Sequence, residues 1–99
     1  MNDEELGRVL KALADPNRRR ILELLAEAKT TCDTGINCSR ITGQLTVSQP
    51  TVSHHMKELA TANLVTMTPN GTAAILSLRR DTLETAFATL RERFHLSTK

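Results

Sequence analysis

The chain has 99 residues, enough for a single domain spanning residues 1–99, and its formal net charge of +2 permits nucleic-acid binding without proving it. It contains two phenylalanines and no tryptophan or tyrosine, so the core must be aliphatic. No stretch approaches the roughly 20 apolar residues of a membrane span, and the acidic start Met-Asn-Asp-Glu-Glu is unlike a signal peptide, so we expect a cytoplasmic protein with no membrane partner.

The first 28 residues predict two helices joined by a tight turn. Asn2 can cap the first helix, with Glu5 completing a capping box, and Asp15-Pro16 suits the end of one helix and the start of the next. The apolar stripe of the first helix is Leu6, Val9, Leu10 and Leu13. The second helix is apolar over a wider arc and should lie at the centre of the fold, through Ile21, Leu22, Leu24, Leu25 and Ala28.

Three consecutive arginines, residues 18–20, follow the turn. They are most simply interpreted as charge facing solvent or phosphate, although Arg18 alone could lock the turn between the two helices. Residues 29–37 show no periodicity and predict a loop, and residues 38–45 predict a short helix with Ile41 and Leu45 on its inner face.

A further helix is expected from Ser48 to Thr61. The Ser48 hydroxyl can accept from the backbone N–H of Thr51, and Pro50 lies in a first turn where N–H groups lack intrahelical partners. With the short helix just before it, this forms a helix-turn-helix, whose second helix usually enters the major groove of DNA.

The two faces of this helix differ in chemistry. Its inner face carries Val52, Met56, Leu59 and Ala60, and its outer face carries Pro50, Thr51, His54, Lys57, Glu58 and Thr61. We expect both His54 and His55 to be exposed. An ordinary solvated surface would look similar, but the preceding helix and the following hairpin favour contact with base edges and phosphates.

A β-hairpin should follow. Short apolar runs flank Pro69-Asn70-Gly71, and Asn-Gly tolerates the positive φ angles of a type I′ turn. A hairpin directly after a reading helix is the wing of a winged helix. The predicted fold is therefore mainly α with a small β-hairpin wing, in the order of four helices, two strands and a fifth helix.

The last helix should begin at an Asp81 cap, with Glu84 in a capping box. Its apolar stripe has heptad-like spacing, through Leu83, Ala86, Phe87, Leu90 and Phe94. This stripe could fold back on its own core, but contact with a second copy of the chain is favoured, because the second helix already fills so small a core.

Two motifs, together with the hairpin, resemble the ArsR/SmtB family of bacterial winged-helix repressors over residues 6–95: LKALADPNR at 10–18, continued by Ile21-Leu22, and SQPTVSHHMKEL at 48–59. The resemblance implies a homodimer on a pseudo-palindromic operator in double-stranded DNA. Its interface would use the first and last helices, through Leu6, Val9, Leu10, Leu13, Leu83, Phe87, Leu90 and Phe94. The expected DNA contacts are Ser48, Gln49, Thr51, Ser53, His54 and Lys57, with Asn70 in the wing.

The effector sites of the family do not carry over. Its arsenic-binding cysteines would fall at Asn37, Ser39 and Thr42, and its last-helix zinc site leaves only Asp81, Glu92 and His95, with Arg79 where a ligand should be. The loop after the second helix instead carries Cys32 and ends at Cys38. These thiols could form a disulfide, hold a metal or metalloid with a third ligand, or simply pack, so no cofactor is certain.

Three other functions remain open at this point. The chain could repress without any effector, or the winged helix could serve as a protein-protein interaction module. An enzyme is disfavoured, because the cysteines and histidines have no phosphate loop or evident cleft beside them.

Overall fold

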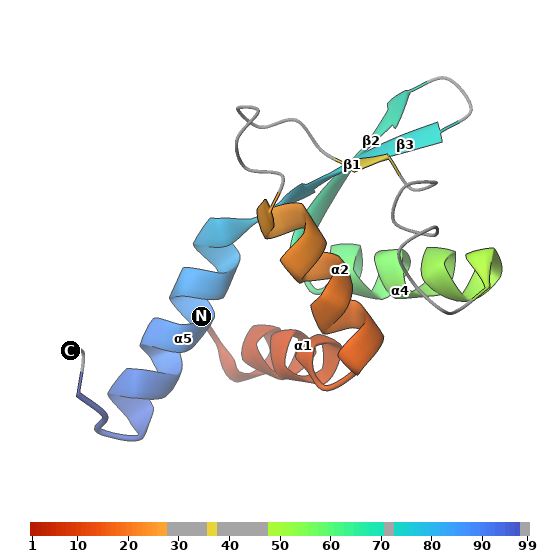
Figure 1. Cartoon of the computed structure of the whole chain (residues 1–99). Coiled ribbons are helices and arrows are strands. Elements are labelled where there is room, and N and C mark those ends of the chain that lie inside the picture. The colour runs from red at the N-terminus through yellow and green to blue at the C-terminus, as the bar shows by residue number, and fades with distance from the viewer. Residues whose placement is uncertain (28–35, 38–47, 71–72, 98–99) are drawn as a thin grey trace.

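The computed structural model describes residues 1–27, 36–37, 48–70 and 73–97 of the chain (Figure 1). Its elements are α1 (Asp3–Leu13), α2 (Pro16–Glu27), β1 (Ile36–Asn37), α4 (Gln49–Thr61), β2 (Val65–Asn70), β3 (Ala73–Leu78) and α5 (Arg80–Arg93). The predicted class, mainly helical with a small β wing, is confirmed. The short helix expected over residues 38–45 lies outside the described residues.

The starts of α1 and α2 are set by local sequence, as predicted. Asn2 Oδ1 accepts from the N–H of Glu5 at 2.7 Å, and the N–H of Asn2 donates to Glu5 Oε1 at 3.1 Å, which completes the capping box. Asp15 Oδ1 then accepts from the N–H groups of Asn17 and Arg18, at 2.8 and 3.2 Å, while Pro16 is the first residue of α2.

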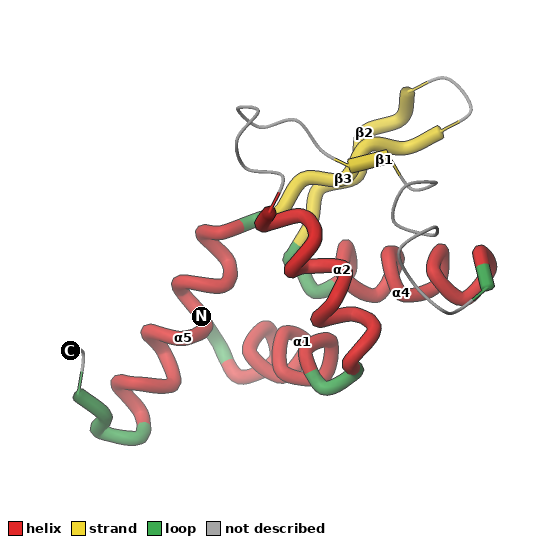
Figure 2. Tube along the Cα trace, viewed as in Figure 1, coloured by secondary structure: helices red, strands yellow, loops and turns green. Residues whose placement is uncertain are grey.

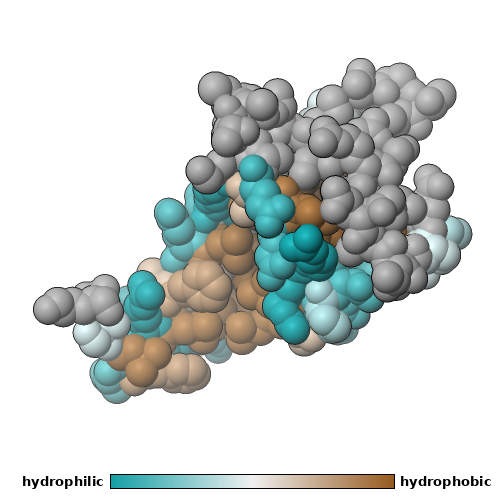
Figure 3. Space-filling model, viewed as in Figure 1, coloured by the Kyte–Doolittle hydropathy of each residue, from teal (hydrophilic) through white to brown (hydrophobic). Residues whose placement is uncertain are grey.

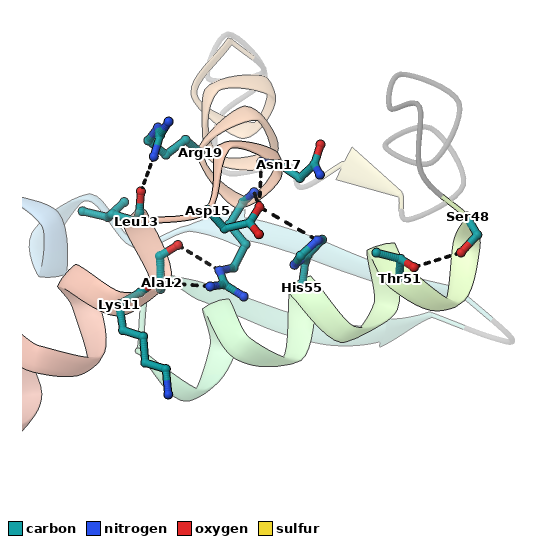
Figure 4. Close-up of polar contacts among 10 residues, drawn as sticks. Lys11, Ala12, Leu13, Asp15, Asn17, Arg19, Ser48, Thr51 and His55 are labelled. Atoms are coloured by element: carbon teal, nitrogen blue, oxygen red, sulfur yellow. Dashed lines mark hydrogen bonds and ion pairs between the residues drawn. The ribbon is translucent and has the colours of Figure 1, made fainter.

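Arginines of α2 close the turn between α1 and α2 (Figure 4). Arg18 donates through Nε to the carbonyl of Ala12 at 2.9 Å and through Nη2 to that of Lys11 at 3.2 Å. Arg19 Nη1 donates to the carbonyl of Leu13 at 2.7 Å. The last carbonyls of α1 therefore accept hydrogen bonds from charged donors. Of the two interpretations offered for Arg18, the structure shows the one in which it locks the turn between the two helices.

The core lies where α1, α2 and α4 meet the sheet (Figure 2). It is aliphatic, as composition required, and its least exposed large side chains are Val9, Ile21, Val52, Met56, Leu59, Leu64 and Leu76. Both phenylalanines lie outside it, Phe87 on α5 and Phe94 at the C-cap of that helix, with 47% and 65% of their surface exposed. Among the helices in the described ranges, none is long and apolar enough to cross a membrane.

The sheet has three antiparallel strands in the order β1-β3-β2. Ile36 and Asn37 pair with Leu76 and Ile75, so the prediction of an uninterrupted loop over residues 29–37 was wrong at its end. The turn prediction also needs correction. Asn70 pairs with Ala73 as the last residue of β2, so the strand connection falls on residues 71–72, outside the described ranges.

The start of α5 also differs from the prediction. Arg79 is the N-cap residue, Asp81 lies within the first turn, and no side-chain capping bond forms, so neither the Asp81 cap nor the Glu84 capping box is present. The reason is that the guanidinium of Arg79 binds both carboxylate oxygens of Asp81. In the views of Figures 1 and 2, α4 and α5 extend toward opposite ends of the molecule.

Candidate nucleic-acid interface

The N-terminus of α4 is open to solvent. Ser48 is the N-cap residue and its carbonyl accepts from the N–H of Val52 at 3.0 Å, but its hydroxyl does not accept from the N–H of Thr51 as predicted. The Ser48 Oγ instead lies 2.9 Å from Thr51 Oγ1, because the threonine offers a second hydroxyl at the right spacing (Figure 4). With no side chain capping α4, its first-turn N–H groups can meet an anion.

One long face of α4 presents polar groups to solvent. The exposed side chains among the expected DNA contacts are Ser48, Thr51, Ser53, His54 and Lys57. The side chains of Gln49 and Asn70 lie outside the described residues. The exposed set combines hydroxyls, an imidazole and one ammonium, which can donate to phosphate oxygens and hydrogen-bond to base edges.

The opposite face of α4 anchors it to the rest of the domain. Val52 and Met56 are each 1% exposed and Leu59 is fully buried, as the apolar pattern predicted. The fourth buried position is His55, which is 7% exposed, whereas Ala60 is only half-buried. The expectation that His55 is exposed was therefore wrong, because the turn between α1 and α2 covers that flank of α4 (Figure 4).

His55 faces the acid that caps α2. Its Nε2 lies 4.0 Å from Asp15 Oδ1, and its Nδ1 is buried with no hydrogen-bond partner among the described residues. Burial acts to raise the pKa of Asp15, but the backbone N–H groups of Arg18 and Asn17, with His55 and the Arg18 charge, outweigh it and hold that pKa below its ordinary value. The N-cap of α2 therefore stays ionised beside α4.

A second surface lies on α1 and α5, away from the polar face of α4. Large apolar side chains that remain exposed there are Leu10 (43%), Phe87 (47%), Phe94 (65%) and Leu96 (55%). Figure 3 shows hydrophobic surface extending over this region, bordered by hydrophilic residues of α2. Exposed apolar area of this kind is typical of an interaction site.

The expected interface residues differ in what they offer a partner. Leu6 and Val9 are 6% and 1% exposed and already pack within the chain, whereas Leu13, Leu83 and Leu90 are half-buried. The sequence did not predict Leu96 as part of this exposed surface, because Leu96 lies beyond the heptad-like stripe of the last helix.

The candidate effector residues are not assembled into a site within the described chain. Cys32 and Cys38, and the positions of Ser39 and Thr42, lie outside the described residues. No group of three His, Cys, Asp or Glu side chains in the described ranges could hold a metal ion, so Asp81, Glu92 and His95 do not converge there. The Asp81 carboxylate is already bound to Arg79 at 3.0 Å.

Comparison with known proteins gives consistent matches. A helix-turn-helix domain model matches residues 13–68. The arsenical resistance operon repressor of Staphylococcus xylosus is 38% identical over 84 residues, which covers 85% of this chain and 75% of that protein.

Two solved structures share the fold. The crystal structure of an ArsR family transcriptional regulator superimposes with a TM-score of 0.83 at 20% identity, over 96% of this chain and 92% of its own. The solution structure of a homodimeric winged helix-turn-helix DNA-binding domain from Mycobacterium bovis gives 0.69 at 22% identity, over 100% of this chain and 94% of its own.

Proposed function

Because the chain belongs to the ArsR family of winged-helix transcriptional regulators, we propose that it is a homodimeric repressor that reads a pseudo-palindromic operator in double-stranded DNA. One α4 would enter the major groove of each half-site. The observation that carries this proposal is the division of α4 into an exposed polar face and a buried face fixed by Val52, Met56 and Leu59.

Base reading and phosphate contact are assigned to different residues of the exposed face of α4. His54 and Thr51 lie on the exposed face, where they can reach base edges, while Lys57 and the uncapped N-terminus at Ser48 suit phosphates. Gln49 and Ser53 are proposed as further contacts in the groove, and Asn70 as a contact of the wing.

The homodimer is supported by the exposed apolar surface on α1 and α5. A solved relative with this fold, from Mycobacterium bovis, is homodimeric. Two copies related by a twofold axis would bury Phe87 and Phe94, which a lone chain leaves in water. A dimer with twofold symmetry in turn predicts an operator with the same symmetry. Its two half-sites should be separated by one turn of the DNA helix or by a whole number of turns.

The test is selection of bound duplexes from a random library by the purified protein, with sedimentation to measure its assembly. We expect enrichment of an inverted repeat bound by a dimer. Equal retention of selected and scrambled duplexes would contradict sequence reading. Failure to bind any duplex at low salt would favour the rival function, a protein-interaction module that buries the exposed face of α4 against another protein.

We also propose that Cys32 and Cys38 make the repressor responsive to an oxidant or a thiol-binding metal or metalloid. These residues flank, in sequence, the strand β1 that pairs with β3, so joining their sulfurs would constrain the chain between α2 and the reading helix. Operator affinity should differ between the reduced and oxidised protein, and the difference should vanish in a Cys32→Ser variant. Equal affinities in all three would leave a repressor without this response.

A further inference from the structure

Arg79, at the junction between β3 and α5, joins the end of α4 to the start of α5. Its guanidinium binds Asp81 through two bonds, from Nε to Oδ1 at 3.2 Å and from Nη2 to Oδ2 at 3.0 Å. The remaining nitrogen, Nη1, donates to Asn63 Oδ1 at 3.2 Å. One side chain thus contacts the residue after the reading helix and a residue in the first turn of the last helix.

Asn63 is held firmly to the end of α4. Its φ of 64° is in the left-handed region, and its N–H donates to the carbonyl of Ala60 at 3.0 Å. The next N–H, of Leu64, donates to the carbonyl of Leu59 at 3.0 Å, which completes a Schellman motif. These two bonds, together with the full burial of Leu64, tie the backbone of Asn63 to the last turn of α4.

Asp81 gives the guanidinium its orientation. The hydrogen bond from Arg79 lowers the pKa of Asp81, so the carboxylate that accepts the two bonds is ionised at neutral pH. The backbone N–H of Arg79 also donates to the carbonyl of Leu64 at 2.8 Å, which fixes the start of the side chain. The third nitrogen of the guanidinium is therefore directed at Asn63.

A surface pocket lies beside this junction. A pocket of about 340 Å³ lies between α1, the end of α4 and the start of α5, and its lining includes Thr61, Asn63, Asp81 and Thr82. Because part of the space between these elements is open, we expect the polar contacts of Arg79 to contribute to the relative direction of α4 and α5.

We propose that Arg79 is a positioning residue for DNA reading, which sets the direction of α4 relative to α5 through its contact with Asn63. The inference rests on the proposed function, in which α5 pairs two copies and α4 reads a half-site. The contact would then fix how the two reading helices of a dimer face successive half-sites, without touching DNA itself.

The decisive variant is Asn63→Gly. Glycine is the preferred residue at this left-handed position, so the helix end is retained while the acceptor for Arg79 is removed. Asn63→Asp keeps an acceptor. His95→Gly is the matched control, since His95 has a φ of 55° and ends α5 in the same way, while the side-chain hydrogen bonds of Arg79 go to Asp81 and Asn63.

Affinity should be measured for the selected full operator and for a duplex carrying one half-site, at an ionic strength where the wild type binds both. For Asn63→Gly we expect about three- to tenfold weaker binding of the full operator and less than about twofold change on the half-site, the scale of one lost hydrogen bond to a charged group. Asn63→Asp and His95→Gly should bind both duplexes like the wild type.

Three results would overturn the inference: unchanged affinity of Asn63→Gly for the full operator, an equal loss on both duplexes, or a weakened dimer by sedimentation. An equal loss would place the effect within one reading helix. If the wild type binds no duplex, the proposed function fails first and the inference fails with it.

Discussion

Nε2 of His55 lies 4.0 Å from Oδ1 of Asp15, and this approach links α4 to the cap of α2. The separation suits an ion pair when the imidazole is protonated and is too long for a strong hydrogen bond. Nδ1 of His55 is buried without a partner in the described structure, so we expect the side chain to contribute mainly by filling space between α4 and the turn.

The first prediction concerns that packing. Replacing His55 by Ala should lower the free energy of unfolding by about 2 kcal/mol, because a cavity is left beside the core. His55→Leu fills most of the space and removes a polar atom that has no partner, so it should cost less than about 1 kcal/mol. Urea denaturation at neutral pH measures both. An equal loss for the two variants would instead assign the stability to the contact with Asp15.

The second prediction is a pH dependence. The pKa of Asp15 is lower in the folded chain, so its carboxylate stabilises the fold above the unfolded pKa of about 3.9, and that stabilisation disappears as the pH falls through the lower folded value. Asp15→Asn keeps a capping oxygen but cannot ionise. The wild type should therefore lose its advantage over Asp15→Asn below about pH 4, in urea titrations across the acid range. A constant difference at every pH would contradict this.

The third prediction separates base reading from general affinity. Removing the exposed imidazole with His54→Ala should cost about 1 to 3 kcal/mol on the selected operator and little on scrambled duplex. Competition binding with single-position operator variants should show relaxed preference at one base pair. A uniform loss on all sequences would make His54 a phosphate contact.

The fourth prediction is the complementary case. Lys57→Ala should weaken selected and scrambled duplexes alike and reduce the slope of log affinity against log salt by about 1, since one fewer counterion is released. Binding isotherms at several salt concentrations give the slope. An unchanged slope would place Lys57 away from the DNA backbone.

The fifth prediction tests the surface on α1 and α5. Phe87→Asp and Phe94→Asp should each raise the dimer dissociation constant at least about tenfold, because a charge would be buried between two copies. Both side chains are exposed in the single chain, so its fold should persist in far-ultraviolet circular dichroism. Met67→Glu, at a 38% exposed position on β2, is the control and should leave sedimentation unchanged.

Sequence reasoning succeeded where the determinant is local. The Asn2 and Glu5 capping box and the start of α2 at Pro16 each depend on residues within one helical turn. The same holds for the buried side of α4, where Val52, Met56 and Leu59 follow the helical period.

Sequence reasoning failed where contact with a distant segment of the chain determines the local structure. The helical period places His55 only at the border of the apolar face of α4. Its burial comes from the turn that carries Asp15, which packs against it. The two residues of β1 carry no strand signal of their own and exist through pairing with β3. Asp81 has the sequence of a helix cap, but the neighbouring Arg79 competes for its carboxylate.

The placement of the two phenylalanine rings on α5 and at its C-cap has a spectroscopic consequence. With no tryptophan or tyrosine in the chain, near-ultraviolet dichroism of the reduced protein arises chiefly from those two rings, and neither belongs to the aliphatic interior. Dilution should therefore change this band while the peptide signal stays constant. Assembly and folding can then be followed separately in one unlabelled sample.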